Sequence, residues 1–219
     1  VTSMANEHLN IKNIPAIIWG DTSSKVYLYI HGQGGYKEEA EAFASIANRY
    51  GWQVLSIDLP EHGERKEERD LFNPWTIVPE LLTVMQYAKN RWVDIALFAN
   101  SIGAWFSMLS FKNENLEKCL FVSPVLDMKS LIQKMMSWAN VSQERLRHEQ
   151  TIPTSFGQTL SWKYWEYAAN NPVTQWKVPT KILYAGKDHL TDRDTVEAFY
   201  IAGLIITFSP ARYKPNSRK

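Results

Sequence analysis

The sequence predicts an α/β fold in which a mostly parallel sheet is flanked by helices and carries a helical insertion. Short apolar runs such as Val26–Ile30 have the continuous hydrophobicity of strands that are buried on both faces. Helical patterns such as Lys37–Tyr50 alternate with these runs, which indicates parallel strands joined by helical crossovers. From residue 125 to residue 175 the alternation gives way to helical patterns alone. We therefore predict a core of residues 1–124 and 176–219 with a helical cap of residues 125–175.

The chain begins with a polar stretch and then alternates strands with helices. Residues 1–10 are polar and without pattern, which predicts a loose end. Ile14–Trp19 is apolar around Pro15 and predicts an edge strand, because proline is tolerated there. The helical spacing that begins at Lys37 stops at Gly51, a residue type that often ends helices in a left-handed conformation.

The middle of the chain continues this alternation. Gln53–Ile57 is the next predicted strand, and the densely charged residues 64–70 after it predict a solvated loop. Asn73 followed by Pro74 is typical of a helix start, so we expect a helix that extends to about Asn90. The next predicted elements are a strand from Asp94, a helix that ends at Phe111, and a strand at Lys118–Val122.

The predicted cap contains helical segments and no strand. These segments are Lys129–Asn140, Gln143–His148 and Ser161–Asn170. The region is rich in aromatic residues, which either form its own small core or line an apolar substrate pocket: Trp138, Trp162, Tyr164, Trp165 and Tyr167. After the cap we predict a strand at Thr180–Tyr184, a helix at Thr191–Tyr200 and a last strand at Leu204–Phe208.

Charge and composition indicate which partners and which cellular compartment to expect. The 219 residues carry a formal net charge of +1, so charge does not favour nucleic acid or an acidic membrane as a partner. No run approaches the roughly 18 apolar residues of a membrane span, and no secretory signal pattern precedes the fold, so we expect a cytoplasmic protein. The single cysteine, Cys119, lies in an apolar run and predicts a core thiol.

Cofactor motifs are weak in this sequence. The run HGQGG at residues 31–35 is too short for a dinucleotide-binding fingerprint, and there is no Walker-type phosphate loop. His31, Asp58 and His62 could in principle hold a metal, but no ligand spacing supports such a site. We expect no cofactor and no metal.

The residues from Asp94 to Trp105 carry the strongest indication of chemistry. They predict a buried strand, a tight turn at Ser101 and a helix that starts at once. Such a turn exposes a serine hydroxyl above the end of a sheet, beside a helix N-terminus that favours negative charge. Ala99 occupies the first glycine position of the Gly-x-Ser-x-Gly pattern, and Gly103 occupies the second. The alternative is that Ser101 only caps the helix.

With its companion motifs, the chain resembles the α/β-hydrolase superfamily over about residues 11–195. The run HGQGG at residues 31–35 resembles the family's oxyanion loop. The run DLPEHG at residues 58–63 resembles its Asp-x-Pro-Gly-His-Gly turn, with Glu61 in place of the first glycine. Gly186-Lys187-Asp188, after a later predicted strand, resembles the loop that holds the catalytic acid. The resemblance implies a serine esterase or acyl hydrolase acting on a small, partly apolar acyl substrate.

The resemblance also implies a role for each site residue. Ser101 is the expected nucleophile, and Asp188 is the expected acid that orients the base. The backbone amides of Gln33 and Ile102 are the expected oxyanion hole, where each donor contributes about 2.7–4 kcal/mol to catalysis.

The general base is the incomplete part of this constellation. In the family the histidine follows the acid in the chain, but the only histidine after Asp188 is its neighbour His189. Adjacent side chains on a loop rarely face each other. His189 is therefore a candidate only with another partner, such as Asp192 or Asp194.

Three other histidines are alternatives with structural explanations of their own. His31 is expected to support the oxyanion loop, His62 to brace the turn after Asp58, and His148 to face solvent. Residues 200–219 also lack the histidine loop and the closing helix that are usual in the family. We therefore expect weak or no turnover from this chain. The alternative is a non-catalytic protein that binds a small molecule or a partner, including a homo-oligomer that covers the bare sheet face.

Overall fold

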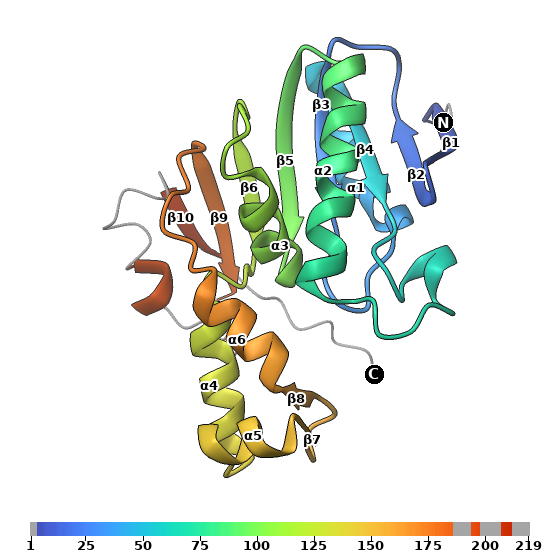
Figure 1. Cartoon of the computed structure of the whole chain (residues 1–219). Helices are drawn as coiled ribbons and strands as arrows, with labels where there is room; N and C mark the ends of the chain where they lie inside the picture. The colour runs from blue at the N-terminus through green and yellow to red at the C-terminus, as the bar shows by residue number, and fades with distance from the viewer. Residues whose placement is uncertain (1–3, 186–193, 198–206, 212–219) are drawn as a thin grey trace, which may run out of the picture.

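The computed structural model describes residues 4–185, 194–197 and 207–211. Eight strands form one sheet in the order β1-β2-β4-β3-β5-β6-β9-β10 (Figure 1). Their bounds are β1 Asn6–Ile11, β2 Ile14–Trp19, β3 Lys25–Ile30, β4 Gln53–Ile57, β5 Asp94–Asn100, β6 Cys119–Val122, β9 Thr180–Ala185 and β10 Thr207–Ala211. The strands from β4 to β10 in this order pair in parallel, as the alternating sequence pattern predicts.

Helices cover both faces of this sheet. The 3₁₀ turn Lys37–Glu39, helix α1 Ala40–Ala47 and a second 3₁₀ turn Asn48–Tyr50 follow β3, and Gly51 then adopts a left-handed conformation with φ 75°. Helices α2 Pro74–Arg91 and α3 Ile102–Phe111 pack beside each other on the opposite face from α1. Successive residues along a strand point to opposite faces, so Val54 packs with the α1 alanines while Leu55 packs with α2 and α3.

The predicted start of α2 is confirmed in detail. The side chain of Asn73 accepts a hydrogen bond from the Thr76 amide at 2.8 Å, and Pro74 occupies the first helical turn. The asparagine cap satisfies one of the amides that a helix start leaves without a partner, and the proline, which has no amide hydrogen, removes another.

The first strands differ from the sequence prediction in two ways. Residues 6–11, expected to be loose, form β1 and pair antiparallel with β2. β2 is consequently not an edge strand, because it lies between β1 and β4. Pro15 is tolerated because the β2–β4 ladder begins only at Ala16. The missing amide of Pro15 therefore removes no bond from that ladder.

The predicted cap lies beyond the carboxyl ends of the parallel strands, below the sheet in Figure 1. Between β6 and β9 the chain forms α4 Met128–Trp138, α5 Gln143–Glu149, β7 Thr151–Pro153, β8 Thr159–Ser161 and α6 Trp162–Asn170. The expectation of helices without strands was wrong, because β7 and β8 form a short antiparallel hairpin between α5 and α6. Three-residue strands are too short to show an alternating pattern in the sequence.

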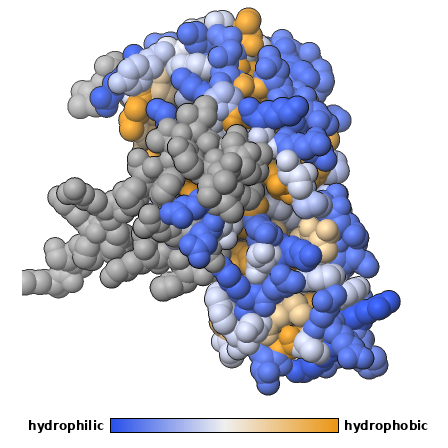
Figure 2. Space-filling view, turned by 90° about the vertical axis from the view of Figure 1, so that its left-hand side faces the viewer, coloured by the Kyte–Doolittle hydropathy of each residue, from blue (hydrophilic) through white to orange (hydrophobic). Residues whose placement is uncertain are grey.

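The end of the chain is described only in part. Residues 194–197, within the predicted helix Thr191–Tyr200, are helical, and β10 overlaps the predicted strand Leu204–Phe208, whose residues 204–206 lie outside the described residues. On the side of the molecule seen in Figure 2, hydrophilic residues dominate the surface formed by the described residues, with scattered hydrophobic ones between them. Such a mixture is ordinary for a protein surface.

Sheet order brings three loops to one place. β3 lies between β4 and β5, and the chain changes from one face of the sheet to the other after β4. The loops that follow β3, β4 and β5 therefore meet at the carboxyl edge where the winding direction changes. This is the position where open α/β sheets commonly bind ligands.

Candidate active site

Ser101 occupies a sharp turn between the centre of the sheet and α3. Its backbone has φ 51° and ψ −122°, a conformation that residues with a side chain rarely adopt. The neighbouring strand holds this turn, since the Ser101 amide donates to the Val122 carbonyl at 3.0 Å. The Ser101 carbonyl accepts from the amides of Val125 at 3.0 Å and Ala104 at 3.1 Å. Backbone strain kept in place by such contacts is typical of functional sites.

The Ser101 hydroxyl does not cap the helix that follows it. Ser101 stands at the N-cap position of α3, yet its side chain accepts no capping hydrogen bond. The side chain is partly exposed. Asp127, Ser142 and Ser161, by contrast, all cap the helices that follow them. Helix capping therefore does not explain Ser101.

Replacing Ser101 by glycine is expected to raise the free energy of unfolding by about 1 kcal/mol. Glycine relieves backbone strain of about 1–3 kcal/mol in the folded state. Its greater conformational freedom stabilises the unfolded state by roughly 0.5–1 kcal/mol, which offsets part of this gain. Ser101→Ala keeps the Cβ atom and should remain within about 0.5 kcal/mol of the wild type. Urea unfolding of the three proteins makes the comparison. A Ser101→Gly variant less stable than Ser101→Ala would contradict this description of the turn.

Two glycines allow the loop after β3 to approach Ser101 closely. A Cβ atom on Gly32 would lie 3.1 Å from the Ser101 Cβ and 3.2 Å from the Asn100 carbonyl oxygen. A Cβ atom on Gly103 would lie 2.4 Å from the His31 carbonyl oxygen. The predicted oxyanion loop therefore lies directly against the predicted nucleophile.

The predicted oxyanion donors are the amides of Gln33, in the loop after β3, and of Ile102, directly after Ser101. Residues 32–35 form a tight turn, closed by a hydrogen bond of 3.1 Å from the Gly35 amide to the Gly32 carbonyl, with Gly34 at φ 79°. The amide of Gln33 is not used in closing that turn, and Gln33 is exposed. Ile102 is the first residue of α3, so its amide has no acceptor within the helix.

His31 is a buried support of the two loops. Its Nε2 accepts from the Leu59 amide at 3.0 Å, and its Nδ1 lies 2.7 Å from the Gly32 carbonyl oxygen. Because Nε2 accepts a hydrogen bond, the ring proton belongs on Nδ1. Burial lowers the pKa of His31 to about 4, against an opposing contribution from the Gly32 carbonyl, so the ring is neutral near pH 7.

Acidification is expected to destabilise the fold through His31. A histidine whose pKa is lower in the folded state binds fewer protons there, so its contribution is complete above about pH 6.5 and is lost as the pH falls toward 4. The loss is about 3 kcal/mol. Urea unfolding at several pH values across this window measures it. His31→Gln should show a shallower dependence on pH, and equal slopes for the two proteins would contradict this role.

His62 connects the same two loops. Its Nε2 accepts from the Gly34 amide at 2.8 Å, and its Nδ1 lies 2.8 Å from the Pro60 carbonyl oxygen. Both ring nitrogens of His31 and of His62 are thus bonded to backbone groups. This arrangement favours the supporting roles that the sequence analysis expected for the two histidines. It leaves no ring nitrogen of either residue available to take a proton from Ser101.

The carboxylate of Asp58 has the contacts of a structural group rather than those of a metal ligand. Its side chain is fully buried and accepts from the Lys37 amide and Nζ, both at 2.8 Å, and from the Glu64 amide at 3.0 Å. Burial disfavours the charge on Lys37, but hydrogen bonds to Asp58, Glu64 and Glu38 outweigh it and raise the pKa of Lys37. Gly63 makes room, because a Cβ atom there would lie 2.2 Å from the carboxylate.

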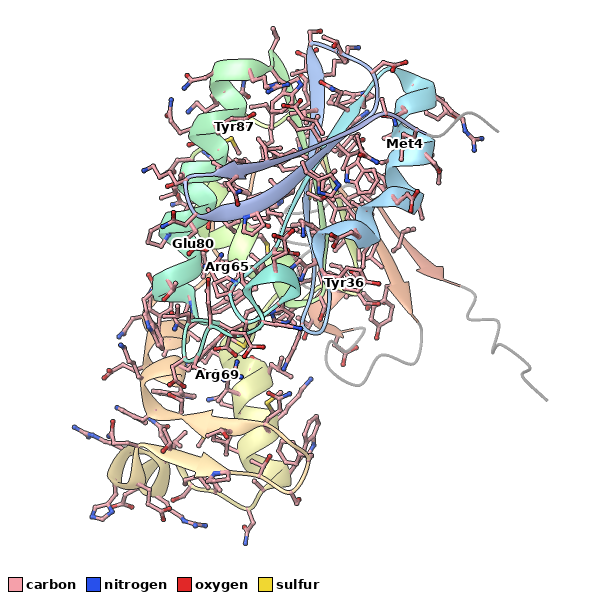
Figure 3. The ribbon with its side chains drawn as sticks, turned by 90° about the vertical axis from the view of Figure 1, so that its right-hand side faces the viewer. Met4, Tyr36, Arg65, Arg69, Glu80 and Tyr87 are labelled. Atoms are coloured by element: carbon pink, nitrogen blue, oxygen red, sulfur yellow. The ribbon has the colours of Figure 1, made fainter. Side chains whose placement is uncertain are left out.

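Lys37 and Arg65 are site supports that the sequence analysis missed. Residues 64–70 were expected to be a solvated loop, but Arg65 is buried and bonds to Glu80 of α2 at 2.7 and 2.8 Å, as well as to Glu68 (Figure 3). Glu61, at φ 67° where the family pattern has glycine, accepts from the Leu71 amide at 3.0 Å. A buried carboxylate at the end of a strand needs a partner of opposite charge. Asp58 at the end of a predicted strand could therefore have indicated a buried cation such as Lys37.

Several solved structures are similar to this chain over most of its length. Est1E from Butyrivibrio proteoclasticus has a TM-score of 0.71 at 17% identity, covering 94% of this chain and 88% of that chain. The Pyrococcus furiosus esterase Pf2001 has a TM-score of 0.64 at 14% identity, covering 95% and 82%. The thioesterase domain from the curacin biosynthetic pathway has a TM-score of 0.62 at 15% identity, covering 96% and 93%. No family model and no curated protein matches the chain.

The chain has the α/β-hydrolase fold. TM-scores of 0.62–0.71 over 94–96% of this chain establish the shared architecture, which the motifs of the sequence predicted, at identities of only 14–17%. The chemistry has to be argued from the residues of this chain.

The acid side of the site falls mainly outside the described residues. Asp188, His189 and Asp192 all lie there. Asp194 is the first of the described helical residues 194–197 and is exposed. His148 is exposed on α5, as predicted. The assignments of Asp188 as the acid and His189 as a base candidate stay predictions.

Aromatic side chains join the cap of this α/β-hydrolase fold to its core. Tyr164 and Tyr167 of α6 contact Trp105 of α3, with ring centroids 5.8 and 6.4 Å apart, and Trp75 of α2, at 5.9 and 6.0 Å. Trp162 stacks on Trp165 within α6 at 5.0 Å. These contacts give the rings a packing role. A role in lining an acyl pocket stays a prediction.

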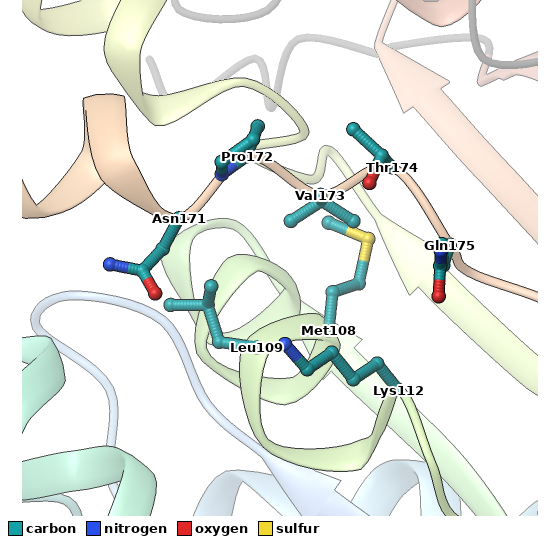
Figure 4. Close-up of a pocket in the computed structure, with 8 residues that line it drawn as sticks. All are labelled: Met108, Leu109, Lys112, Asn171, Pro172, Val173, Thr174 and Gln175. Atoms are coloured by element: carbon teal, nitrogen blue, oxygen red, sulfur yellow. The ribbon is translucent and has the colours of Figure 1, made fainter.

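A cavity of about 230 Å³ lies at the opposite end of α3 from Ser101. Its lining combines the last residues of α3 with residues 171–175, which precede β9 (Figure 4). Lys112 and Asn171 are among its polar side chains. Its position separates it from the turn at Ser101.

Within residues 4–185, 194–197 and 207–211, no group of three or more histidine, cysteine or acidic side chains is arranged to hold a metal ion. No helix in that part of the chain is long and apolar enough to cross a membrane. Cys119 is buried in β6, and burial raises the pKa of its thiol, as expected of a core cysteine.

Proposed function

We propose that the chain is a serine hydrolase of the esterase or acyl-hydrolase type, with Ser101 as its nucleophile. The observation that carries this proposal is the strained, non-capping Ser101 at the turn between β5 and α3, with the Gly32–Gly35 turn against it. Two structural neighbours are named as an esterase and a thioesterase domain, which supports hydrolysis on this scaffold.

The proposed reaction is acyl transfer in two steps. Ser101 Oγ attacks the acyl carbon of a small, partly apolar ester, and the alcohol leaves with a proton to give an acyl-enzyme. Water then attacks the same carbon and releases the carboxylic acid. In both steps the amides of Gln33 and Ile102 stabilise the negative oxygen of the tetrahedral intermediate. Asp188 is the proposed acid that orients the base.

We propose that turnover by residues 1–219 is weak. Residues 190–219 contain no histidine, and the ring nitrogens of His31 and His62 are held by backbone groups. Loss of one triad member removes most of the rate, although the oxyanion hole and substrate binding still leave about 10³–10⁴-fold acceleration over water.

Ester hydrolysis by purified wild type and Ser101→Ala tests the proposal. The substrates are p-nitrophenyl acetate, p-nitrophenyl butyrate and methyl ferulate, the last because ferulic acid is bound in a structure of Est1E. Slow hydrolysis that disappears in Ser101→Ala and persists in Ser45→Ala, an exposed serine of α1, is the expected result. Equal hydrolysis by Ser101→Ala would rule out the nucleophile, and rapid turnover by wild type would rule out the impairment.

A non-catalytic binding protein on the same scaffold is the second candidate. The observation that favours it is the engagement of both His31 and His62 with backbone groups. It predicts that a small acyl compound binds without hydrolysis and that Ser101→Ala leaves its affinity unchanged. Calorimetric titration with butyrate and ferulate, combined with the hydrolysis assay, separates the two candidates.

A further inference from the structure

His62 holds one particular peptide of the turn beside Ser101. Its Nε2 accepts from the Gly34 amide at 2.8 Å. A ring nitrogen that accepts an amide hydrogen carries no proton, so the ring proton is on Nδ1, which faces the Pro60 carbonyl oxygen at 2.8 Å. The bond to Gly34 therefore exists only while His62 is neutral.

The turn depends on this bond for its conformation. The hydrogen bond from Gly35 to Gly32 closes both common types of β-turn, which differ in the orientation of the peptide between the two central residues. That peptide joins Gln33 to Gly34. Gly34 has φ 79° and open space around its Cα, so neither sterics nor a side chain fixes the peptide. The acceptor on His62 selects one orientation.

Other groups around the ring do not compete for this role. The His31 ring lies 5.1 Å away between centroids, and its pKa of about 4 keeps it neutral while the pH falls from 8 to 5. The Phe72 ring packs at 4.6 Å. Glu39 interacts electrostatically with His62, and its carboxylate accepts from the Tyr36 amide.

The remaining charges on the same loops are also engaged. Glu61 accepts from the backbone amides of Leu71 and Phe72, at 3.0 and 3.3 Å. Asp58 and Glu64 both pair with Lys37, at 2.8 and 2.7 Å. A proton on Nε2 would therefore face the hydrogen of the Gly34 amide, and one donor would oppose another.

We propose that His62 is the positioning residue of the oxyanion loop, and that its protonation releases the Gly34 amide and lowers the reactivity of Ser101. The second half of this inference rests on the proposed function, because it treats the turn as the oxyanion loop. His62 acts through the Gln33–Gly34 peptide and does not touch the substrate.

Nuclear magnetic resonance on the ¹⁵N-labelled protein tests the first half without any activity. Long-range proton–nitrogen spectra report the protonation of the His62 ring, and the Gly34 amide reports the contact. Wherever the Gly34 amide is protected, we expect Nε2 to be unprotonated. As the pH falls, hydrogen-exchange protection of the Gly34 amide should disappear with the same midpoint as the ring titration. An amide that stays protected while His62 becomes doubly protonated would overturn the proposal.

The rate at which a fluorophosphonate labels Ser101 tests the second half. His62→Gln offers a carbonyl oxygen to the Gly34 amide but does not titrate. It should keep at least a tenth of the wild-type rate and lose the decline in acid. His62→Leu offers no acceptor and should fall below about a tenth of the wild-type rate at every pH, because the peptide that follows the donor residue Gln33 is no longer held. His148→Gln, an exposed histidine of α5, should behave as wild type.

The outcomes separate this inference from the proposed function. If His62→Leu is labelled at the wild-type rate, or if His62→Gln keeps the wild-type acid decline, the positioning role is overturned. If wild type is not labelled at all, the proposed function and the reactivity half of the inference both fail. The resonance measurement on Gly34 then still decides whether His62 holds the turn.

Discussion

Replacing Lys37 by methionine is expected to lower the free energy of unfolding by about 3–5 kcal/mol. The substitution removes the cation that faces Asp58, whose carboxylate is fully buried, and breaking a buried pair in this way leaves an uncompensated charge. Two backbone amides still donate to Asp58, but they do not neutralise it. Urea unfolding of both proteins at pH 7 measures the difference.

The exposed pair of Lys89 and Glu114 provides the matched control. Its nitrogen and oxygen atoms are also 2.8 Å apart, but the Lys89 side chain is 48% exposed. Lys89→Met is expected to change stability by less than about 1 kcal/mol, because solvent already screens such a pair. Equal losses from the two substitutions would show that Asp58 does not depend on Lys37.

Replacing Gly103 by alanine is expected to be the most damaging single-methyl change near the site. The added Cβ atom would lie 2.4 Å from the His31 carbonyl oxygen and 2.8 Å from that of Ile30, and backbone atoms at the end of a central strand cannot easily move aside. Overpacking of this kind typically costs about 1–3 kcal/mol and occasionally more. It should also shift Ser101 relative to the Gly32–Gly35 turn, so labelling of Ser101 should fall with stability.

Gly157→Ala is the control that separates the effect of steric overlap from the effect of a left-handed backbone conformation. Gly157 has φ 86° but nothing within 4 Å of an added Cβ atom, so its replacement tests the left-handed conformation alone. We expect a loss of about 1 kcal/mol and unchanged labelling. A Gly103→Ala protein as stable as Gly157→Ala would contradict the close approach of α3 to the end of β3.

The central part of the fold was predictable because its patterns are long. β3, β4 and β5 consist mostly of apolar residues, and the Asn-Pro start and the spacing of α2 predict its bounds to within a residue or two. The motifs at residues 31–35 and 99–103 then predict that the loop after β3 meets the turn after β5. Gly32 and Gly103 show why small residues are needed there.

The elements that were missed depend on tertiary contacts. β1 is mostly exposed and polar, so only its pairing with β2 identifies it as a strand. The hairpin β7–β8 has strands of three residues. Arg65 lies in a run of charges that is typical of solvent, and its burial follows from α2 placing Glu80 beside it. Sequence patterns do not report contacts of this kind.

Labelling with a fluorophosphonate, measured by intact mass, tests the central claim that the turn between β5 and α3 presents a reactive Ser101. The wild-type chain and Ser101→Ala are treated in parallel, and circular dichroism verifies that both are folded. The account predicts slow formation of a single adduct on the wild type and none on Ser101→Ala. A folded wild type that forms no adduct, or an adduct that persists in Ser101→Ala, would contradict it.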